Sequence, residues 1–253
     1  MYRTCRSPAV VAGRATGCVS AAGSAPVGKV RHTTPHNPTR YLSAQGVALF
    51  TTDTVHAVPN MHKTIFDTPI VNTLLRGLSI TYLKLAGWKV EGCLPPNATK
   101  SVLIAAPHTS NWDLPYTLMV AFTLKLNVYW MGKESLFKPP FRSVMMWLGG
   151  IPVRRESSNN LVAASSEAIE AADGPLQLIV PPEGTRSKAR YWKTGFYYIA
   201  VGAQVPIVMA YMDYSRKVSG LGPVLMPTGD LEADLATIKA FYAPFKGKNP
   251  DQF

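Results

Sequence analysis

Short apolar runs alternate with longer amphipathic runs over most of the chain after residue 100. The runs that fit buried strands are 101–106, 128–133, 151–156, 176–180 and 205–214. The runs that fit helices are 114–126, 139–150, 159–174, 197–203 and 229–245. This alternation of strands and helices predicts an α/β domain with a mostly parallel central sheet flanked by helices.

An N-terminal amphipathic helix is predicted within residues 64–86, ahead of the first strand. Its apolar side chains recur at helical spacing: Ile70, Leu74, Leu75, Leu78, Tyr82 and Leu85. Arg76 and Lys84 interrupt this pattern, so the segment does not read as a membrane span. The helix either packs on the domain or lies in a membrane interface with its apolar face down.

Residues 194–212 carry no charge and therefore need a separate check for a membrane span. Gly195, Gly202 and Pro206 break the segment, which fits a helix followed by a buried strand. No transmembrane helix is predicted.

The first 60 residues differ in composition from the remainder of the chain. They are rich in Ala, Gly, Ser, Thr and Pro, and residues 1–52 hold six Lys and Arg without any Asp or Glu. Without sustained apolar periodicity, residues 1–60 are predicted to be disordered. They are either an organelle targeting segment or an extension upstream of a domain at 61–253. The frequent Pro and Gly favour the extension.

The net charge is +11, and +5 of it belongs to residues 53–253. A moderate basic excess suits an anionic membrane surface or a substrate that carries phosphate. The chain has no arginine-rich helix and no zinc-finger spacing, so no nucleic-acid partner is expected. The three cysteines show no metal or redox spacing, which fits a reducing compartment.

One stretch, HTSNWD at 108–113, places a histidine and an aspartate between a predicted strand and a predicted helix. On one continuous helix, residues five apart would point roughly 140° away from each other. They can meet if His108 lies in the turn and Asp113 lies at the helix start, with Ser110 or Asn111 as the cap. Asp113 would then accept a hydrogen bond from the imidazole and leave its other nitrogen as a base.

Three later stretches add candidate binding residues. GGIPVRR at 149–155 ends in two arginines, whose planar side chains suit phosphate. PEGTRS at 182–187 follows a predicted strand, and Gly184 there allows the backbone to approach a ligand closely. VPIVMA at 205–210 is a predicted core strand beside the pocket.

Together and in this order, the four stretches resemble the blocks of the glycerophospholipid acyltransferases, a family that includes the lysophosphatidic acid acyltransferases and their compact bacterial members. The similarity spans roughly residues 80–215. It implies that His108 and Asp113 are catalytic, with His108 as general base. It also implies the substrate-binding residues, which are Arg155, Glu183, Gly184, Thr185 and Arg186.

The resemblance implies transfer of an acyl group from an acyl thioester to the hydroxyl of a lysophospholipid such as 1-acylglycerol-3-phosphate, in phospholipid synthesis. The donor would be acyl-CoA or acyl-carrier protein, used as a co-substrate, and neither a metal nor another cofactor is implied. The lipid substrates make a membrane surface a partner, so the protein is expected in the cytoplasm, peripherally associated with the inner face of a membrane. Residues 64–86 and 190–198 are the candidate docking segments.

Other functions stay open. The same base could serve a different lipid acceptor, since Arg154, Pro107, Pro181 and Met209 depart from the family's usual residues. A serine hydrolase is disfavoured because the chain lacks the G-x-S-x-G turn. A membrane-binding protein without catalysis is disfavoured by the intact histidine and aspartate.

Overall fold

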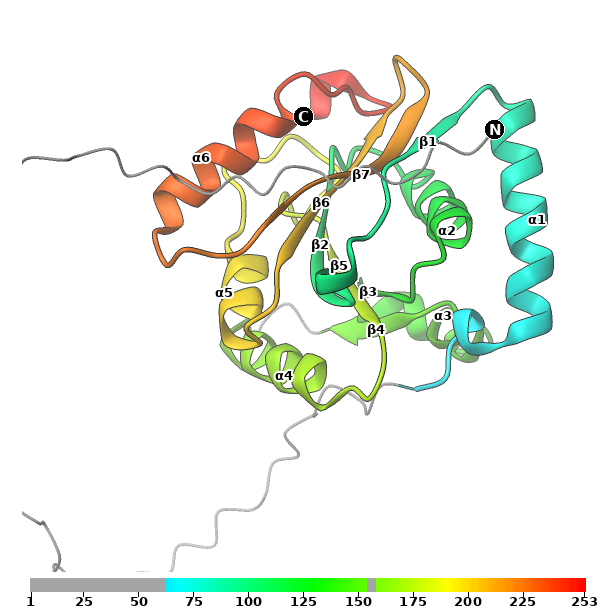
Figure 1. The fold of residues 1–253 in the computed structure, drawn as a ribbon, viewed down its shortest axis with the longest axis horizontal. Helices are drawn as coiled ribbons and strands as arrows, with labels where there is room; N and C mark the ends of the chain where they lie inside the picture. Colours follow the sequence, from blue (N-terminus) through cyan, green and yellow to red (C-terminus); the bar gives the residue numbers. More distant parts are fainter. Residues whose placement is uncertain (1–61, 154–157) are drawn as a thin grey trace, which may run out of the picture. The chain divides into compact units, whose positions relative to one another are not determined.

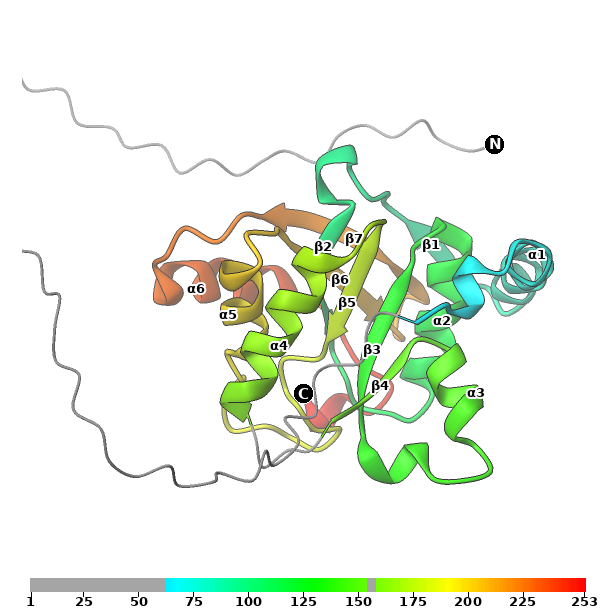
Figure 2. The same ribbon diagram turned by 90° about the horizontal axis from the view of Figure 1, so that it is seen from below.

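The computed structural model describes residues 62–153 and 158–253. The predictions for residues 1–60, and the last residues of the strand predicted at 151–156, lie outside the described residues. The described part contains a seven-stranded sheet and its covering helices (Figures 1 and 2).

The strands lie in the order β1-β7-β6-β2-β5-β3-β4, and every neighbouring pair is parallel except β6 with β7. Their bounds are β1 Lys89–Glu91, β2 Lys100–Ala106, β3 Val128–Lys133, β4 Gly150–Val153, β5 Leu176–Val180, β6 Ile207–Asp213 and β7 Val218–Leu225. The predicted mostly parallel α/β sheet is therefore confirmed.

Helices cover both faces of this sheet. Their bounds are α1 Pro69–Leu85, α2 Asp113–Leu124, α3 Arg142–Trp147, α4 Ser158–Ala171, α5 Gly195–Gly202 and α6 Leu231–Tyr242. Helices α4, α5 and α6 lie on one side, and α1, α2 and α3 lie on the other (Figure 1). Short 3₁₀ helices occupy Ile65–Asp67, Pro96–Ala98, Glu134–Phe137 and Pro250–Gln252.

Strand β2 lies at the centre of the sheet and is buried on both faces. Val102 and Ile104 pack with α4, α5 and α6, whereas Leu103 packs with α2. This alternation follows from the two-residue period of a strand, which sends successive side chains to opposite faces. The carboxyl end of β2 is thereby held rigidly between two cores.

Helix α1 contacts the domain mainly through residues outside the predicted apolar stripe. Ser79 and Leu83 are buried, and Val71 and Leu75 pack against the core. The other predicted apolar residues are exposed: Ile70, Leu74, Leu78, Tyr82 and Leu85. The helix therefore packs on the domain and leaves an apolar stripe uncovered within the described part of the chain.

The charge-free segment 194–212 consists of α5 followed by β6, as predicted. Among residues 62–153 and 158–253, no helix is long and apolar enough to cross a membrane.

A glycine controls the tight connection from α3 to β4. Gly149 has φ +84°, and a Cβ atom there would lie 2.3 Å from the carbonyl oxygen of Val128. We expect Gly149→Ala to lower the free energy of unfolding by about 2 kcal/mol or more, because it adds left-handed strain and a clash with backbone. Urea unfolding of the full chain measures this change.

Gly77→Ala in α1 is the matched control, since nothing lies within 4 Å of its added Cβ. Its helical position predicts a gain of about 0.5–1 kcal/mol. Equal changes in the free energy of unfolding for the two substitutions would contradict the claim that the connection at Gly149 requires a glycine.

Candidate active site

The site forms where three neighbouring strands of the sheet end. Strands β6, β2 and β5 are adjacent and parallel, so their carboxyl ends lie at one edge. His108 follows β2, Glu183 follows β5, and Tyr214 directly follows β6. Sites in open α/β sheets commonly lie at this edge.

The structure brings His108 and Asp113 together, as the sequence predicted. Nδ1 of His108 lies 3.1 Å from Oδ2 of Asp113. An ionised carboxylate can only accept, so Nδ1 carries the hydrogen and Nε2 presents a lone pair. The side chain of His108 is 20% exposed and is one of the residues that line the cavity described below.

Asp113 also holds the turn that precedes its own helix. Its Oδ2 accepts from the backbone N–H groups of Thr109 and Ser110, each at 2.9 Å. The prediction that Ser110 or Asn111 caps this helix is wrong: α2 begins at Asp113, and its N-cap residue Trp112 makes no side-chain cap bond. The Asp113 carboxylate therefore fixes the loop and the imidazole together.

Donors around Asp113 compensate for its burial. Burial alone would raise the pKa of Asp113, but hydrogen bonds from His108, the Ser110 N–H and Tyr214 together hold that pKa below the ordinary value. The carboxylate is therefore charged at neutral pH and can stabilise an imidazolium.

Glu183 supports the other end of the same loop. Its Oε1 accepts from the backbone N–H of His108 at 3.0 Å. Its Oε2 is buried and has no hydrogen-bond partner among the described residues. Burial raises the pKa of Glu183 above the ordinary carboxyl value, although the His108 N–H opposes the shift.

The remaining residues of the PEGTRS stretch lie in the loop between β5 and α5. Gly184 has φ +62°, and an added Cβ would lie 2.9 Å from the side chain of Lys193. Oγ1 of Thr185 accepts from the Ser187 N–H at 3.3 Å, and Arg186 is exposed. The structure thus places this loop beside His108 through Glu183, whereas Arg155 lies outside the described residues.

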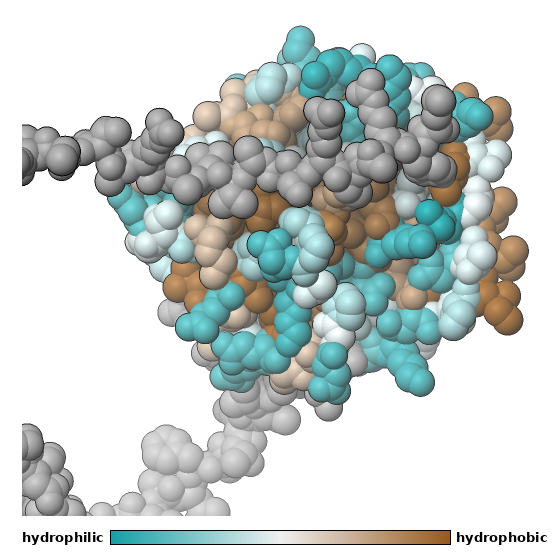
Figure 3. All heavy atoms as spheres, in the orientation of Figure 1, coloured by the Kyte–Doolittle hydropathy of each residue, from teal (hydrophilic) through white to brown (hydrophobic). Residues whose placement is uncertain are grey.

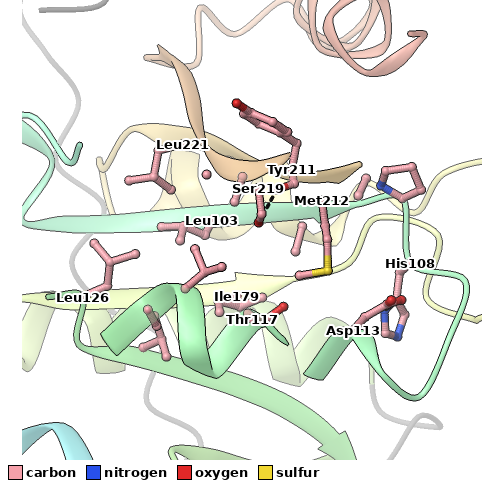
Figure 4. Close-up of a pocket in the computed structure, with 18 residues that line it drawn as sticks. Leu103, His108, Asp113, Thr117, Leu126, Ile179, Tyr211, Met212, Ser219 and Leu221 are labelled. Carbon is pink, nitrogen blue, oxygen red and sulfur yellow. Dashed lines mark hydrogen bonds and ion pairs between the residues drawn. The ribbon is translucent and has the colours of Figure 1, made fainter. Parts of the chain in front are cut away.

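An apolar cavity extends from the site between α2 and the sheet (Figure 4). His108 and Asp113 lie at one end, and Leu126 lies at the other (Figure 4). Between them the cavity is lined mostly by aliphatic side chains, which include Leu103, Val120, Ile179 and Leu221. Its shape places apolar space directly beside the imidazole.

Two residues that were not predicted from the sequence, Tyr214 and Asn249, also contact the site. The hydroxyl of Tyr214 donates to Oδ1 of Asp113 at 2.8 Å. Asn249 binds Thr109 twice, from its backbone N–H to Oγ1 at 3.2 Å and from Nδ2 to the carbonyl oxygen at 2.8 Å. The end of the predicted strand 205–214 could have indicated Tyr214, but no local pattern marks Asn249.

The two buried carboxyl groups should affect stability in opposite directions. Asp113 stabilises the fold above its unfolded pKa of about 3.9, and this contribution is lost as the pH falls through its lower folded pKa. We expect Asp113→Asn to lower the free energy of unfolding by about 2 kcal/mol at pH 8, since charge-assisted hydrogen bonds are lost. The deficit should shrink below about pH 4.

Glu183 has a raised pKa, so its stabilisation is present below about pH 4.3 and is lost as the pH rises through the folded pKa. Glu183→Gln keeps an acceptor for the His108 N–H and removes the buried charge. We expect this variant to be at least as stable as the parent at pH 8 and to converge with it near pH 4. Urea unfolding at both pH values measures the two variants, and a large loss for Glu183→Gln at pH 8 would contradict the raised pKa.

Comparison with known proteins gives two findings. The family model described as Acyltransferase matches residues 88–213. The crystal structure of the 1-acyl-sn-glycerophosphate acyltransferase from Thermotoga maritima is similar, with 17% identity and a TM-score of 0.48 over 68% of this chain and 76% of that chain. Comparison with curated proteins gives no match. On the family match, which spans β2, the HTSNWD turn and the PEGTRS loop, the chain belongs to the acyltransferase family and is an acyltransferase enzyme.

Proposed function

We propose that the protein transfers a fatty acyl group from an acyl thioester to the hydroxyl of a lysophospholipid such as 1-acylglycerol-3-phosphate, in phospholipid synthesis. The observation that carries this proposal is the His108–Asp113 pair, at 3.1 Å, at the end of an apolar cavity. A base beside apolar space is what the acylation of a hydroxyl by a fatty acyl donor requires.

In the proposed reaction, Nε2 of His108 takes the proton from the acceptor hydroxyl while that oxygen attacks the thioester carbonyl carbon. The new C–O bond gives a tetrahedral oxyanion, whose collapse breaks the C–S bond. The thiolate then takes the proton from the imidazolium, which Asp113 has stabilised meanwhile. The acyl group passes directly between substrates, and no other reactant is needed.

The oxyanion needs a hydrogen-bond donor near the base. The N–H groups of four nearby residues, His108, Thr109, Ser110 and Trp112, already have acceptors within the loop or from Glu183. Among the described residues, nothing accepts from the N–H of Asn111 in the same turn. We assign the oxyanion to this group.

The acceptor's phosphate suits the loop after β5. Gly184 and Thr185 follow Glu183 there, and the loop carries the exposed cations Arg186 and Lys188. One guanidinium group can bind two phosphate oxygens at once through two parallel N–H donors. We also assign Arg155 to the phosphate of the acceptor, on the basis of the family resemblance alone.

The acyl chain of the donor suits the apolar cavity. A thioester carbonyl beside His108 would direct its chain under α2 toward Leu126. Apolar lining gives this chain a favourable transfer of about 0.8 kcal/mol for each buried methylene group.

The exposed stripe of α1 suits a membrane surface, which is where lysophospholipids are found. Apolar spheres lie along the outer side of α1 (Figure 3). Helix α3 lies beside the N-terminal end of α1 in both ribbon views (Figures 1 and 2). Val144 and Trp147 of α3 and its N-cap residue Phe141 are exposed, as is Arg142. Apolar and aromatic side chains with nearby cations are typical of peripheral attachment, here to the inner face of a membrane.

The second docking segment that the sequence suggested, residues 190–198, suits this role less well. Phe196 and Tyr197 are buried, and Trp192 packs against the core. Tyr191 and Tyr198 are exposed. We therefore assign membrane attachment to α1 and α3.

His108→Ala should abolish the lysophosphatidic-acid-dependent release of thiol from acyl-CoA. Loss of a general base predicts a fall in kcat of roughly 10²–10⁴-fold. The assay uses the full chain in mixed micelles, with acyl-carrier-protein thioester as a second donor. A panel of acceptors with and without phosphate then separates the proposed acceptor from another lipid.

His62→Ala is the control, because His62 lies away from the site and contacts the carbonyl oxygen of Met146. Turnover of His108→Ala at the parent rate would contradict the proposed base.

The double variant Leu74→Ser and Leu78→Ser should weaken binding to vesicles of anionic phospholipid. Each exposed leucine that enters the interface contributes up to about 2 kcal/mol, so the loss should be at least about tenfold. Flotation of the protein with vesicles measures binding. Activity on substrate dispersed in detergent should be unchanged.

Thr81→Ser, on the exposed side of the same helix, is the matched control and should bind as the parent does. Parent-like vesicle binding by the double leucine variant would contradict the docking role of α1.

A further inference from the structure

The carboxylate of Asp113 has two oxygens with different surroundings. Oδ2 accepts from Nδ1 of His108 and from the N–H groups of Thr109 and Ser110. Oδ1 accepts from the hydroxyl of Tyr214 at 2.8 Å, its one donor in the described part of the chain. The Tyr214 hydroxyl therefore fixes Oδ1, the carboxylate oxygen that the N–H groups of the turn do not bind.

The position of Tyr214 is itself fixed by its surroundings. Its backbone N–H donates to the carbonyl oxygen of Lys246 at 3.0 Å. Its ring meets those of Trp88 and Tyr116 edge-on, with centroids 5.1 and 5.9 Å away. Tyr214 does not line the cavity and so lies apart from the space proposed for substrate.

We propose that Tyr214 is a positioning residue that holds the Asp113 carboxylate in the orientation in which it binds Nδ1 of His108, and that it thereby sets the basicity of Nε2. This inference rests on the proposed role of His108 as the general base. The proposal extends the His108–Asp113 pair to a hydrogen-bonded chain of three side chains, Tyr214, Asp113 and His108. Tyr214 lies just after residue 213, where the family match ends.

Removal of the hydroxyl has two consequences. The carboxylate loses a donor that shares its negative charge, so it attracts the imidazolium more strongly and His108 keeps its proton to a higher pH. The carboxylate can also rotate, which disturbs the direction of the imidazole. The acid limb of the pH–rate profile should therefore move to higher pH, and kcat should fall.

Other ionisable groups near the pair are chemically unchanged in such a variant. Glu183 contacts the loop from β5, Tyr116 faces Tyr214 from α2, and Lys248 lies over the ring of Trp112 at 4.8 Å. A shift of the acid limb in a variant that lacks only the Tyr214 hydroxyl is therefore attributable to that hydroxyl.

The test compares Tyr214→Phe with Tyr116→Phe in the full chain, using acyl-CoA and lysophosphatidic acid as substrates. Both variants keep an aromatic ring in the cluster, but only the first removes a donor to Asp113. We expect Tyr214→Phe to lower kcat about tenfold, with KM unchanged and the acid limb at higher pH. Tyr116→Phe should keep the parent's acid limb.

A double variant separates positioning from a general structural effect. If Tyr214 acts through Asp113, Tyr214→Phe should cause no further loss of kcat in an Asp113→Asn background. The NMR titration of the His108 imidazole gives a second readout that needs no turnover, and Tyr214→Phe should move its midpoint upward.

Three results would overturn the positioning role: an unchanged acid limb and imidazole midpoint, equal shifts in the two tyrosine variants, or a full additional loss in the double variant. His108→Ala, assayed in parallel, separates this failure from failure of the base. If His108→Ala is inactive while Tyr214→Phe matches the parent, only the role of Tyr214 is wrong. Full activity of His108→Ala would overturn the base and the positioning role together.

Discussion

A negative charge buried at the edge of a sheet needs donors on every side, and the Asp113 carboxylate obtains them from several parts of the chain. Backbone N–H groups of its own turn, the imidazole of His108 and the hydroxyl of Tyr214 all point at it. These bonds neutralise the buried charge, and they also immobilise the imidazole of His108 and the turn that carries it. The stability of the fold and the orientation of His108 therefore depend on the same few contacts.

The parallel sheet makes that arrangement possible. Since β6, β2 and β5 run in the same direction side by side, residues far apart in sequence leave the sheet at one edge. Glu183 reaches the backbone of His108 across 75 positions of sequence. The two carboxyl groups, with pKa values shifted in opposite directions by donors and by burial, then hold the loop from either side.

Periodicity predicted the parts of the fold where one pattern dominates. β3 and β5 begin and end where predicted, and the helix at 114–126 starts one residue earlier, at Asp113. Strands β1 and β7 were missed, since β1 has three residues and β7 contains two glycines and a proline. The apolar stripe of α1 was predicted, but whether it faces the domain core or the outside was not. Helical spacing shows which residues share a face, and it does not show what that face contacts. Likewise His108 and Asp113 were readable as a pair, whereas Tyr214 and Asn249 reach the site by tertiary folding that no local spacing encodes.

The clamp that Asn249 places on Thr109 joins residues 140 positions apart. During synthesis the turn that carries His108 leaves the ribosome long before this clamp, and before β6 brings Tyr214. Domains are made from the N-terminus onward at about 5–20 residues per second, so the turn waits several seconds for its partners. A nascent chain that already contains the HTSNWD turn therefore lacks its contacts with Tyr214 and Asn249, which form only after those residues have been added and have left the ribosome.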